Sequence, residues 1–289
     1  MGTSQSSNGS PSGVPMLPPW VPDIPLPVLP SEAVPHEDAE MDGIENQFQY
    51  ESPVRAEPRQ PIPVSPSGRF VGARRNLGDY AHSGDRDRMR RGLGQYVKKG
   101  YGGSAMATRR FSGTAQTAHV LYSALSSGAS NPYTAPGSPL DPVLMEGRSA
   151  DEFMDAVVEA IRPVDGTQDT EASRTASKDA LSDVLARYPD ADLHDMQEEH
   201  RDLAIERYVA DDVFLRFDLD LGKTIIDKSS NAAMGMGRLK EIREYIQETV
   251  AASFRQLRNA GHRLSTGLIT QIVQSVLRET FQVFEGYAG

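Results

Sequence analysis

The sequence predicts an all-α protein, an irregular multi-helix bundle preceded by a long proline-rich extended N-terminal segment. Three observations predict this class. Of the 20 prolines, 14 lie between Pro11 and Pro66. After Gly68, apolar residues recur at helical spacing, and no run of alternating β-branched residues demands a strand. We therefore expect a tail over 1–68 and a helical domain over 69–289, divided into a basic glycine-rich part (69–127), a loop (128–148) and an acidic part (149–289).

The tail is expected to be extended and unable to fold alone, because each proline fixes φ and removes a backbone donor. It nevertheless carries the one tryptophan of the chain, Trp20, within a series of prolines and apolar residues. Extended segments with such anchors commonly dock in grooves of another protein. The residues expected to bind a partner here are Leu17, Pro19, Trp20, Ile24 and Leu26. The alternative is a spacer that packs loosely on its own domain.

The basic part predicts a helix over about 85–99 and a second over about 104–127. Met89, Leu93, Tyr96 and Val97 fall on one face of the first helix. Gly92 and Gly94 each weaken it by about 1 kcal/mol relative to alanine. Either tertiary packing compensates, or another part of the molecule approaches the backbone closely there.

The acidic part begins with a capping box, in which the side chains of Ser149 and Glu152 each accept a hydrogen bond from the backbone amide of the other residue. The helix that follows should end at Pro163. Further helices are expected over about 171–188 and 193–217. Two apolar stripes come last, from Leu239 to Leu257 and from Leu268 to Phe284. The total predicted is six to eight helices.

Composition excludes several classes of function. The chain has no cysteine, which excludes disulfides and thiolate chemistry. No apolar stretch approaches the roughly 20 residues of a transmembrane helix, and no secretory signal opens the sequence. We expect a soluble cytoplasmic protein without a membrane partner.

The net charge of −10 is distributed unevenly. Residues 69–110 carry eleven basic residues against three acidic ones, whereas the segments on either side are acidic. The candidate binding residues in this segment are Arg74, Arg75, Arg86, Arg90, Arg91, Lys98, Lys99, Arg109 and Arg110. Interleaved aromatic residues suit base stacking, so the segment could contact nucleic acid or a nucleotide. The alternative is electrostatic docking to the acidic part of the same chain or to an acidic partner.

Motifs for catalysis are not found. Gly222-Lys223-Thr224 invites a phosphate-loop interpretation, but the required earlier glycine is replaced by Phe217. Asp211, Asp212, Asp218 and Asp220 match no calcium-loop spacing, and the six histidines form no metal-ligand pattern. We therefore predict no catalytic residues, no metal and no cofactor.

The N-terminus carries a separate signal. Met1-Gly2 predicts removal of the initiator methionine, which exposes the α-amine of Gly2. Gly2 followed by Ser6 also fits an N-myristoylation pattern. A single acyl chain binds membranes only marginally without a second signal, and the segment that follows is acidic rather than polybasic. A membrane anchor is thus disfavoured.

Several segments resemble the QatB family of the bacterial Qat anti-phage system. They are Met1–Ser4, Pro18–Trp20, Gly72–Tyr80, Leu93–Ala105 and Phe284–Gly289. The resemblance implies a chain encoded beside an ATPase, a QueC-like enzyme (QatC) and a TatD-like nuclease, all of them candidate partners. It also implies that Gly2 accepts a deazaguanine from the QueC-like enzyme, with Thr3, Ser4 and Gln5 threaded into that enzyme's active site.

Two functions follow from the sequence. The first is a non-catalytic scaffold and substrate subunit of a defence complex that presents Gly2 for modification. The alternative is a nucleic-acid-binding subunit that uses the basic segment 69–110.

Overall fold

A computed structural model describes residues 68–126, 131–193 and 195–289. Within these ranges the chain forms ten α-helices and one π-helix and no strand, which confirms the all-α class. The elements are α1 (Val71–Ser83), α2 (Arg86–Gln95), η1 (Tyr96–Tyr101), α3 (Ser104–Arg110), α4 (Ser112–Ala124), α5 (Pro142–Met145), α6 (Ala150–Ile161), α7 (Gln168–Arg187), α8 (Glu198–Lys228), α9 (Ala232–Asn259) and α10 (Ile269–Gly286). The prediction for the tail lies outside the described residues, apart from Gly68.

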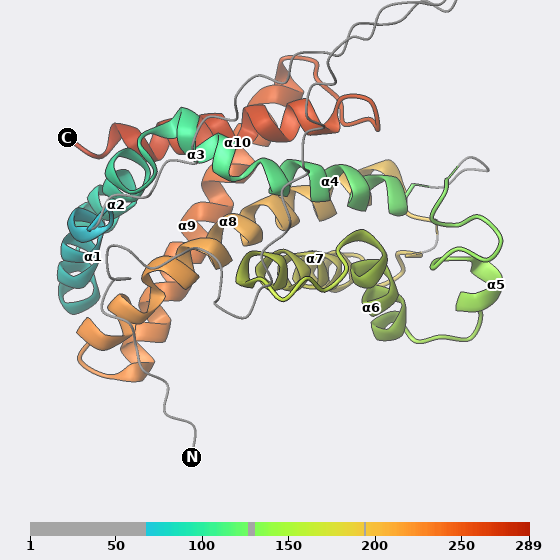
Figure 1. Cartoon of the computed structure of the whole chain (residues 1–289), viewed down its shortest axis with the longest axis horizontal. Helices are drawn as coiled ribbons and strands as arrows, with labels where there is room; N and C mark the ends of the chain where they lie inside the picture. Colours follow the sequence, from blue (N-terminus) through green and yellow to red (C-terminus); the bar gives the residue numbers. More distant parts are fainter. Residues whose placement is uncertain (1–67, 127–130, 194) are drawn as a thin grey trace, which may run out of the picture. The chain divides into compact units, whose positions relative to one another are not determined.

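The long helix α8 is the centre of the helical domain. It packs against α7 along one side and α9 along another, and α1 and α4 also contact it (Figure 1). The last helix, α10, packs on α3, α4 and α9. It also contacts α2 and η1, so segments from both ends of the domain pack together.

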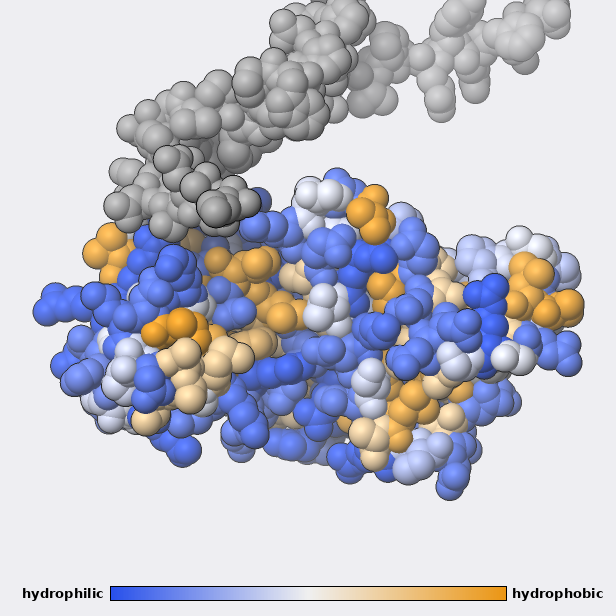
Figure 2. Space-filling view, turned by 90° about the horizontal axis from the view of Figure 1, so that it is seen from below, coloured by the Kyte–Doolittle hydropathy of each residue, from blue (hydrophilic) through white to orange (hydrophobic). Residues whose placement is uncertain are grey.

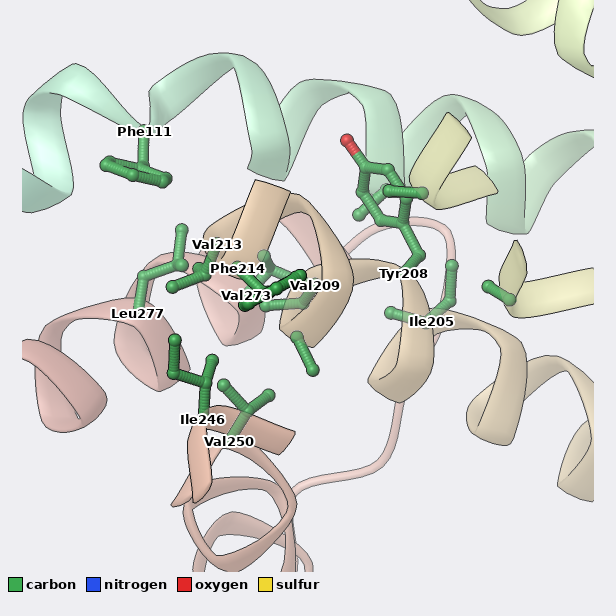
Figure 3. Packing of buried hydrophobic residues seen from close by; sticks show 14 of the residues in the cluster. Phe111, Ile205, Tyr208, Val209, Val213, Phe214, Ile246, Val250, Val273 and Leu277 are labelled. Carbon is green, nitrogen blue, oxygen red and sulfur yellow. The ribbon is translucent and has the colours of Figure 1, made fainter. Parts of the chain in front are cut away.

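The apolar positions of α8 explain its central place. Tyr208, Val209 and Val213 are buried. In Figure 3, Val250 of α9 and Leu277 of α10 lie on the side of Val209 and Val213, whereas Tyr208 lies beside α4. Full burial of an aliphatic or aromatic side chain contributes about 1.5–3 kcal/mol. A helix that is apolar on several faces can satisfy this only by lying between neighbours.

The exposed surface follows the opposite pattern. On the face drawn in Figure 2, hydrophilic residues predominate and hydrophobic residues form separate groups. Exposed apolar side chains such as Val143 and Leu144 of α5 are normal for a folded domain. No helix in the described part of the chain is long and apolar enough to cross a membrane.

Several expectations about the helices were wrong, among them the helix expected over about 193–217, which is α8 and runs from Glu198 to Lys228. The described residues hold ten α-helices, not six to eight, and α1 was not predicted at all. The helix expected over about 104–127 is two helices, because Phe111 (φ −91°, ψ 17°) ends α3 and begins α4. Part of the expected loop 128–148 is the short helix α5, where the Asp141 carboxylate accepts the Val143 amide at 2.9 Å and Pro142 takes the first helical position.

The capping box at the start of α6 is confirmed. The Ser149 hydroxyl accepts a bond from the Glu152 amide at 3.3 Å, and the Glu152 carboxylate accepts one from the Ser149 amide at 2.8 Å. The backbone hydrogen bond also lowers the pKa of Glu152. The negative charge therefore lies beside the positive end of the helix.

Ser149→Ala should lower the free energy of unfolding by about 1 kcal/mol, the usual cost of losing an N-cap oxygen. Urea denaturation followed by circular dichroism should show a lower midpoint with an unchanged slope. Ser182→Ala, at an exposed position inside α7, is the matched control and should change stability little. Equal effects of the two variants would contradict a capping role.

Candidate functional site

The predicted partner-binding residues of the tail, from Gly2 to Gln5 and from Leu17 to Ile24 and Leu26, lie outside the described residues. The predicted basic residues are all described, and they are distributed over α1, α2, η1 and α3. The structure can therefore show which of these cations share a surface.

The helices α1 and α2 form an antiparallel hairpin that sets the positions of the cations. Gly84 makes the turn in the left-handed region (φ +74°), and its amide donates to the Tyr80 carbonyl at 2.7 Å. Asp79 and Arg88 approach to 3.4 Å across the hairpin. A Cβ added at Gly72 would lie 3.1 Å from the Gln95 side chain. This register places Arg75 opposite Arg91.

An open groove of about 780 Å³ lies beside this hairpin. Its lining, which we call the basic groove, is Arg74, Arg75, Gly78, Asp79, His82, Ser83, Asp85, Arg88 and Lys228. Lys228, the last residue of α8, was missed by sequence reasoning because it lies far from the basic segment in the chain. Its side-chain carbons lie over Gly78, where an added Cβ would be 3.4 Å from Lys228 Cγ.

The remaining cations of the segment lie elsewhere. Arg86 and Arg90 line a smaller groove beside Glu241, Glu244 and Glu248 of α9. Lys98 donates to the Gly289 carbonyl at 3.2 Å. Arg109 and Arg110 end α3. The basic residues of segment 69–110, which are close together in the sequence, therefore lie on several different surfaces of the domain.

Most of these cations are not neutralised by the acidic helices. Besides Lys98, which contacts Gly289, seven exposed basic residues of segment 69–110 form no ion pair with any described residue: Arg74, Arg75, Arg86, Arg91, Lys99, Arg109 and Arg110. Arg86 lies beside the glutamates of α9, and the other cations face solvent.

The aromatic residues of the basic segment are packed inside the domain. Phe70 stacks on Tyr96 at a centroid distance of 5.3 Å, Tyr96 meets Phe217 of α8 edge-on at 5.3 Å, and Phe111 meets Phe281 of α10 at 5.0 Å. Tyr80 is also buried, and its hydroxyl donates to Glu241 at 2.8 Å. The suggestion that these rings stack on bases is therefore wrong, because their faces are occupied.

The π-helix η1 carries a polar contact into this aromatic cluster. The hydroxyls of Tyr96 and Tyr101 donate to one carboxylate oxygen of Asp220, at 3.1 and 2.9 Å. Burial raises the pKa of Asp220 and of both tyrosines. These two hydrogen bonds thus attach η1 to α8. The sequence offered no signal for this pairing.

The aspartates considered as cation ligands do not converge. Asp212 is fully buried and accepts from Thr114 at 2.5 Å and Ser173 at 2.6 Å, with Arg216 Nε at 3.1 Å. Asp211 is buried on another face of α8, where it accepts from Arg243 at 3.0 Å. Burial raises the pKa of Asp211 even beside that arginine. No cluster of three or more potential metal ligands occurs among the described residues.

Gly92 and Gly94 are explained by close approach of other parts of the chain. A Cβ at Gly92 would lie 2.5 Å from Leu77 Cγ, and one at Gly94 would lie 2.5 Å from the Ala288 backbone nitrogen. Gly100 likewise receives the ring of Phe70. These glycines let α1 and the residues after α10 pack directly on the α2–η1 backbone.

Asp202 of α8 gives the domain a pH dependence. One of its carboxylate oxygens is buried without a hydrogen-bond partner in the described structure, and burial, together with the charge of Glu198, raises its pKa to about 6. Because the folded state binds this proton more tightly than the unfolded state, stability falls as pH rises from about 4 through about 6.

Asp202→Asn should therefore stabilise the chain by about 1–2 kcal/mol at neutral pH, after allowance for partial exposure. Thermal melts at several pH values provide the measurement. The gain over the original chain should be smallest near pH 4 and reach its full size above about pH 6. A gain that is the same at every pH would contradict this assignment.

The comparisons with known proteins identify the family. No curated protein and no solved structure matches the chain. A family model described as the Qat anti-phage system associated protein QatB matches residues 102–284, from the end of η1 almost to the end of α10. The match includes the central helix α8 and Lys228, whereas α1 and α2 precede it. The chain belongs to the QatB family, and its role is in the Qat anti-phage defence system.

Proposed function

We propose that the chain is a non-catalytic scaffold and substrate subunit of the Qat system that presents Gly2 to the QueC-like partner, QatC, for modification with a deazaguanine. The observation that carries the proposal is the placement of a small-residue terminus, Gly2 to Gln5, ahead of a long proline-rich segment and a helical domain. Family membership supports it by implying partner proteins in the same defence system.

The chemistry of the terminus suits an acceptor. Once Met1 is removed, Gly2 carries an α-amine with an ordinary pKa near 7.7–8.0, so a useful fraction is the free base at neutral pH. Such an amine forms an amide bond with an activated carboxyl group, with loss of the activating group and one proton. Glycine has no side chain, and Thr3 and Ser4 are small. A narrow active site can therefore admit this terminus at little steric cost.

Mass spectrometry of the N-terminal peptide tests the acceptor. The chain is purified after co-expression with the QueC-like partner and, in a parallel culture, without it. We expect added mass on Gly2 only with the partner, and we expect Gly2→Pro to lack it, because proline offers a hindered secondary amine. An unmodified terminus, or a Gly2→Pro chain modified as efficiently as the original, would overturn the proposal.

Co-purification tests whether the anchor around Trp20 holds the partner. Apolar docking should persist at an ionic strength of about 1 M, where the Debye length is only about 3 Å. Deletion of residues 2–30 should abolish co-purification. Replacement of Trp20 alone should weaken it, since large aromatics dominate binding at interfaces. Retention of the partner by the deleted chain would exclude docking through this segment.

Nucleic-acid binding is the second candidate, and one observation favours it. Seven exposed basic side chains of segment 69–110 form no ion pair with described residues. Binding through phosphates would weaken steeply with salt, whereas partner docking through the apolar anchor would not. Charge reversal of Arg90 and Arg91 is the variant that tests the segment as a whole. Unchanged binding by this variant would count against the second candidate.

A further inference from the structure

The basic groove joins cations from two distant parts of the chain. Arg74 and Arg75 come from α1, and Lys228 comes from the end of α8. The Lys228 stem reaches the groove because Gly78 leaves room for it, with only 3.4 Å between an added Cβ and Lys228 Cγ. The packing of α1 on α8 thus builds a cationic surface that the sequence does not display.

The acidic residues of the groove are already engaged. Asp79 pairs with Arg88 at 3.4 Å, and the Asp85 carboxylate accepts the Asp87 amide at 2.9 Å as the cap of α2. Arg74, Arg75 and Lys228 are exposed and form no ion pair with any described residue. The groove therefore holds four basic side chains against two acidic ones and keeps a net positive charge.

The arrangement continues beyond the groove. The hairpin register places Arg91 of α2 at the same level as Arg75, one helical turn beyond the groove residue Arg88, so a further cation lies close to the groove along the hairpin. A row of cations matches the repeated charges of a phosphodiester chain. Guanidinium groups bind phosphate oxygens in a bidentate manner, and a lysine adds a point charge.

The groove lacks the large aromatic rings on which bases commonly stack. His82 is the one ring in its lining, and the Phe and Tyr rings of the same segment pack against other side chains of the domain. We propose that the basic groove binds the phosphodiester backbone of nucleic acid without reading its sequence. This proposal deepens the nucleic-acid candidate above and rests on it, and it is independent of modification at Gly2.

Fluorescence anisotropy of a labelled mixed-sequence duplex with the full chain tests the groove. The original chain should bind with strong salt dependence. Arg74→Gln/Arg75→Gln/Lys228→Gln should weaken binding at low salt by about tenfold or more and reduce the slope of log K against log salt by about 2–3, near 0.9 for each lost phosphate contact. The matched control removes three exposed charges outside segment 69–110: Arg255→Gln/Arg263→Gln/Arg278→Gln. The control should lose much less affinity and slope.

The possible outcomes distinguish failure of the groove proposal from failure of the nucleic-acid candidate and of modification at Gly2. Equal losses of duplex affinity in the two triple variants would overturn the proposal that the groove is the binding site, but nucleic-acid binding by the chain would remain. Absence of any duplex binding by the original chain would overturn both. Binding of an acidic peptide with the sequence of residues 31–58, but not of duplex, would overturn the proposal in favour of a protein ligand. Circular dichroism confirms that each variant folds, and the mass of the N-terminal peptide reports on Gly2 separately.

Discussion

Asp212→Ala should destabilise the chain by about 3–5 kcal/mol, because the buried Arg216 guanidinium loses its buried partner and keeps only the more exposed Asp169, at 3.4 Å. Asp212 has no exposed surface, and it also accepts the hydroxyls of Thr114 and Ser173. Its removal therefore leaves unsatisfied groups on α4, α7 and α8 together. Urea denaturation at neutral pH, followed by circular dichroism, measures the loss.

Two further variants make this prediction specific. Asp227→Ala removes an exposed aspartate that pairs with Lys223 at 2.8 Å on the same helix, and it should change stability by well under 1 kcal/mol. Asp212→Leu combined with Arg216→Met should recover much of the loss, because apolar replacement of both partners removes the unpaired charge. A cost below about 1 kcal/mol for Asp212→Ala would contradict the buried network.

Gly94→Ala should destabilise the chain by about 1–3 kcal/mol, even though alanine is the better helix former. The new methyl carbon would lie 2.5 Å from the Ala288 nitrogen and 2.8 Å from the Tyr287 carbonyl carbon, and backbone cannot rotate away as a side chain can. The residues after α10 would have to move. They would lose the bond from Gln95 to the Ala288 carbonyl and that between Tyr245 and Tyr287, each 2.9 Å.

Gly237→Ala is the matched control. Gly237 lies inside α9, and an added Cβ meets no atom within 4 Å. This variant should gain up to about 1 kcal/mol from helix propensity. Hydrogen exchange should in addition show faster exchange of the Ala288 amide in Gly94→Ala only. A stabilising effect of both alanines would show that the close approach at Gly94 does not constrain the chain.

The helices that the sequence predicted well are those whose signals are local. The capping box at Ser149 depends on residues three apart, and the α9 stripe uses large apolar side chains such as Ile246 and Phe254 at helical spacing. Helix α1 was missed because its buried face includes the small Ala73 and Ala81 beside Leu77 and Tyr80. The packing of Leu77 depends on Gly92 of another helix. A single-segment pattern cannot show such a contact.

The break between α3 and α4 also depends on a contact with a distant part of the chain. Phe111 leaves helical geometry and is buried against Phe281, which lies far along the chain. Its sequence neighbours alone do not mark a break, whereas the tertiary contact accounts for it.

The candidate site was predictable in composition but not in arrangement. The charge of segment 69–110 identifies its arginines and lysines, yet only the hairpin register and the packing of α8 select Arg74, Arg75 and Lys228 as one surface. The aromatic residues between them suggested base stacking, and their burial shows that they belong to the core. Asp212 carried a weak local signal, Arg216 at i+4, which favours an ion pair over a metal site.

Phage challenge of cells that carry the complete Qat system tests most directly the claim that the chain acts in defence through its N-terminal glycine. The chain is supplied as the original, as Gly2→Pro, or as Ser182→Ala as a control for substitution. We expect Gly2→Pro to lose protection in plaque assays while it accumulates and co-purifies with the QueC-like partner as the original does, and we expect Ser182→Ala to protect fully. Full protection by Gly2→Pro would contradict the account.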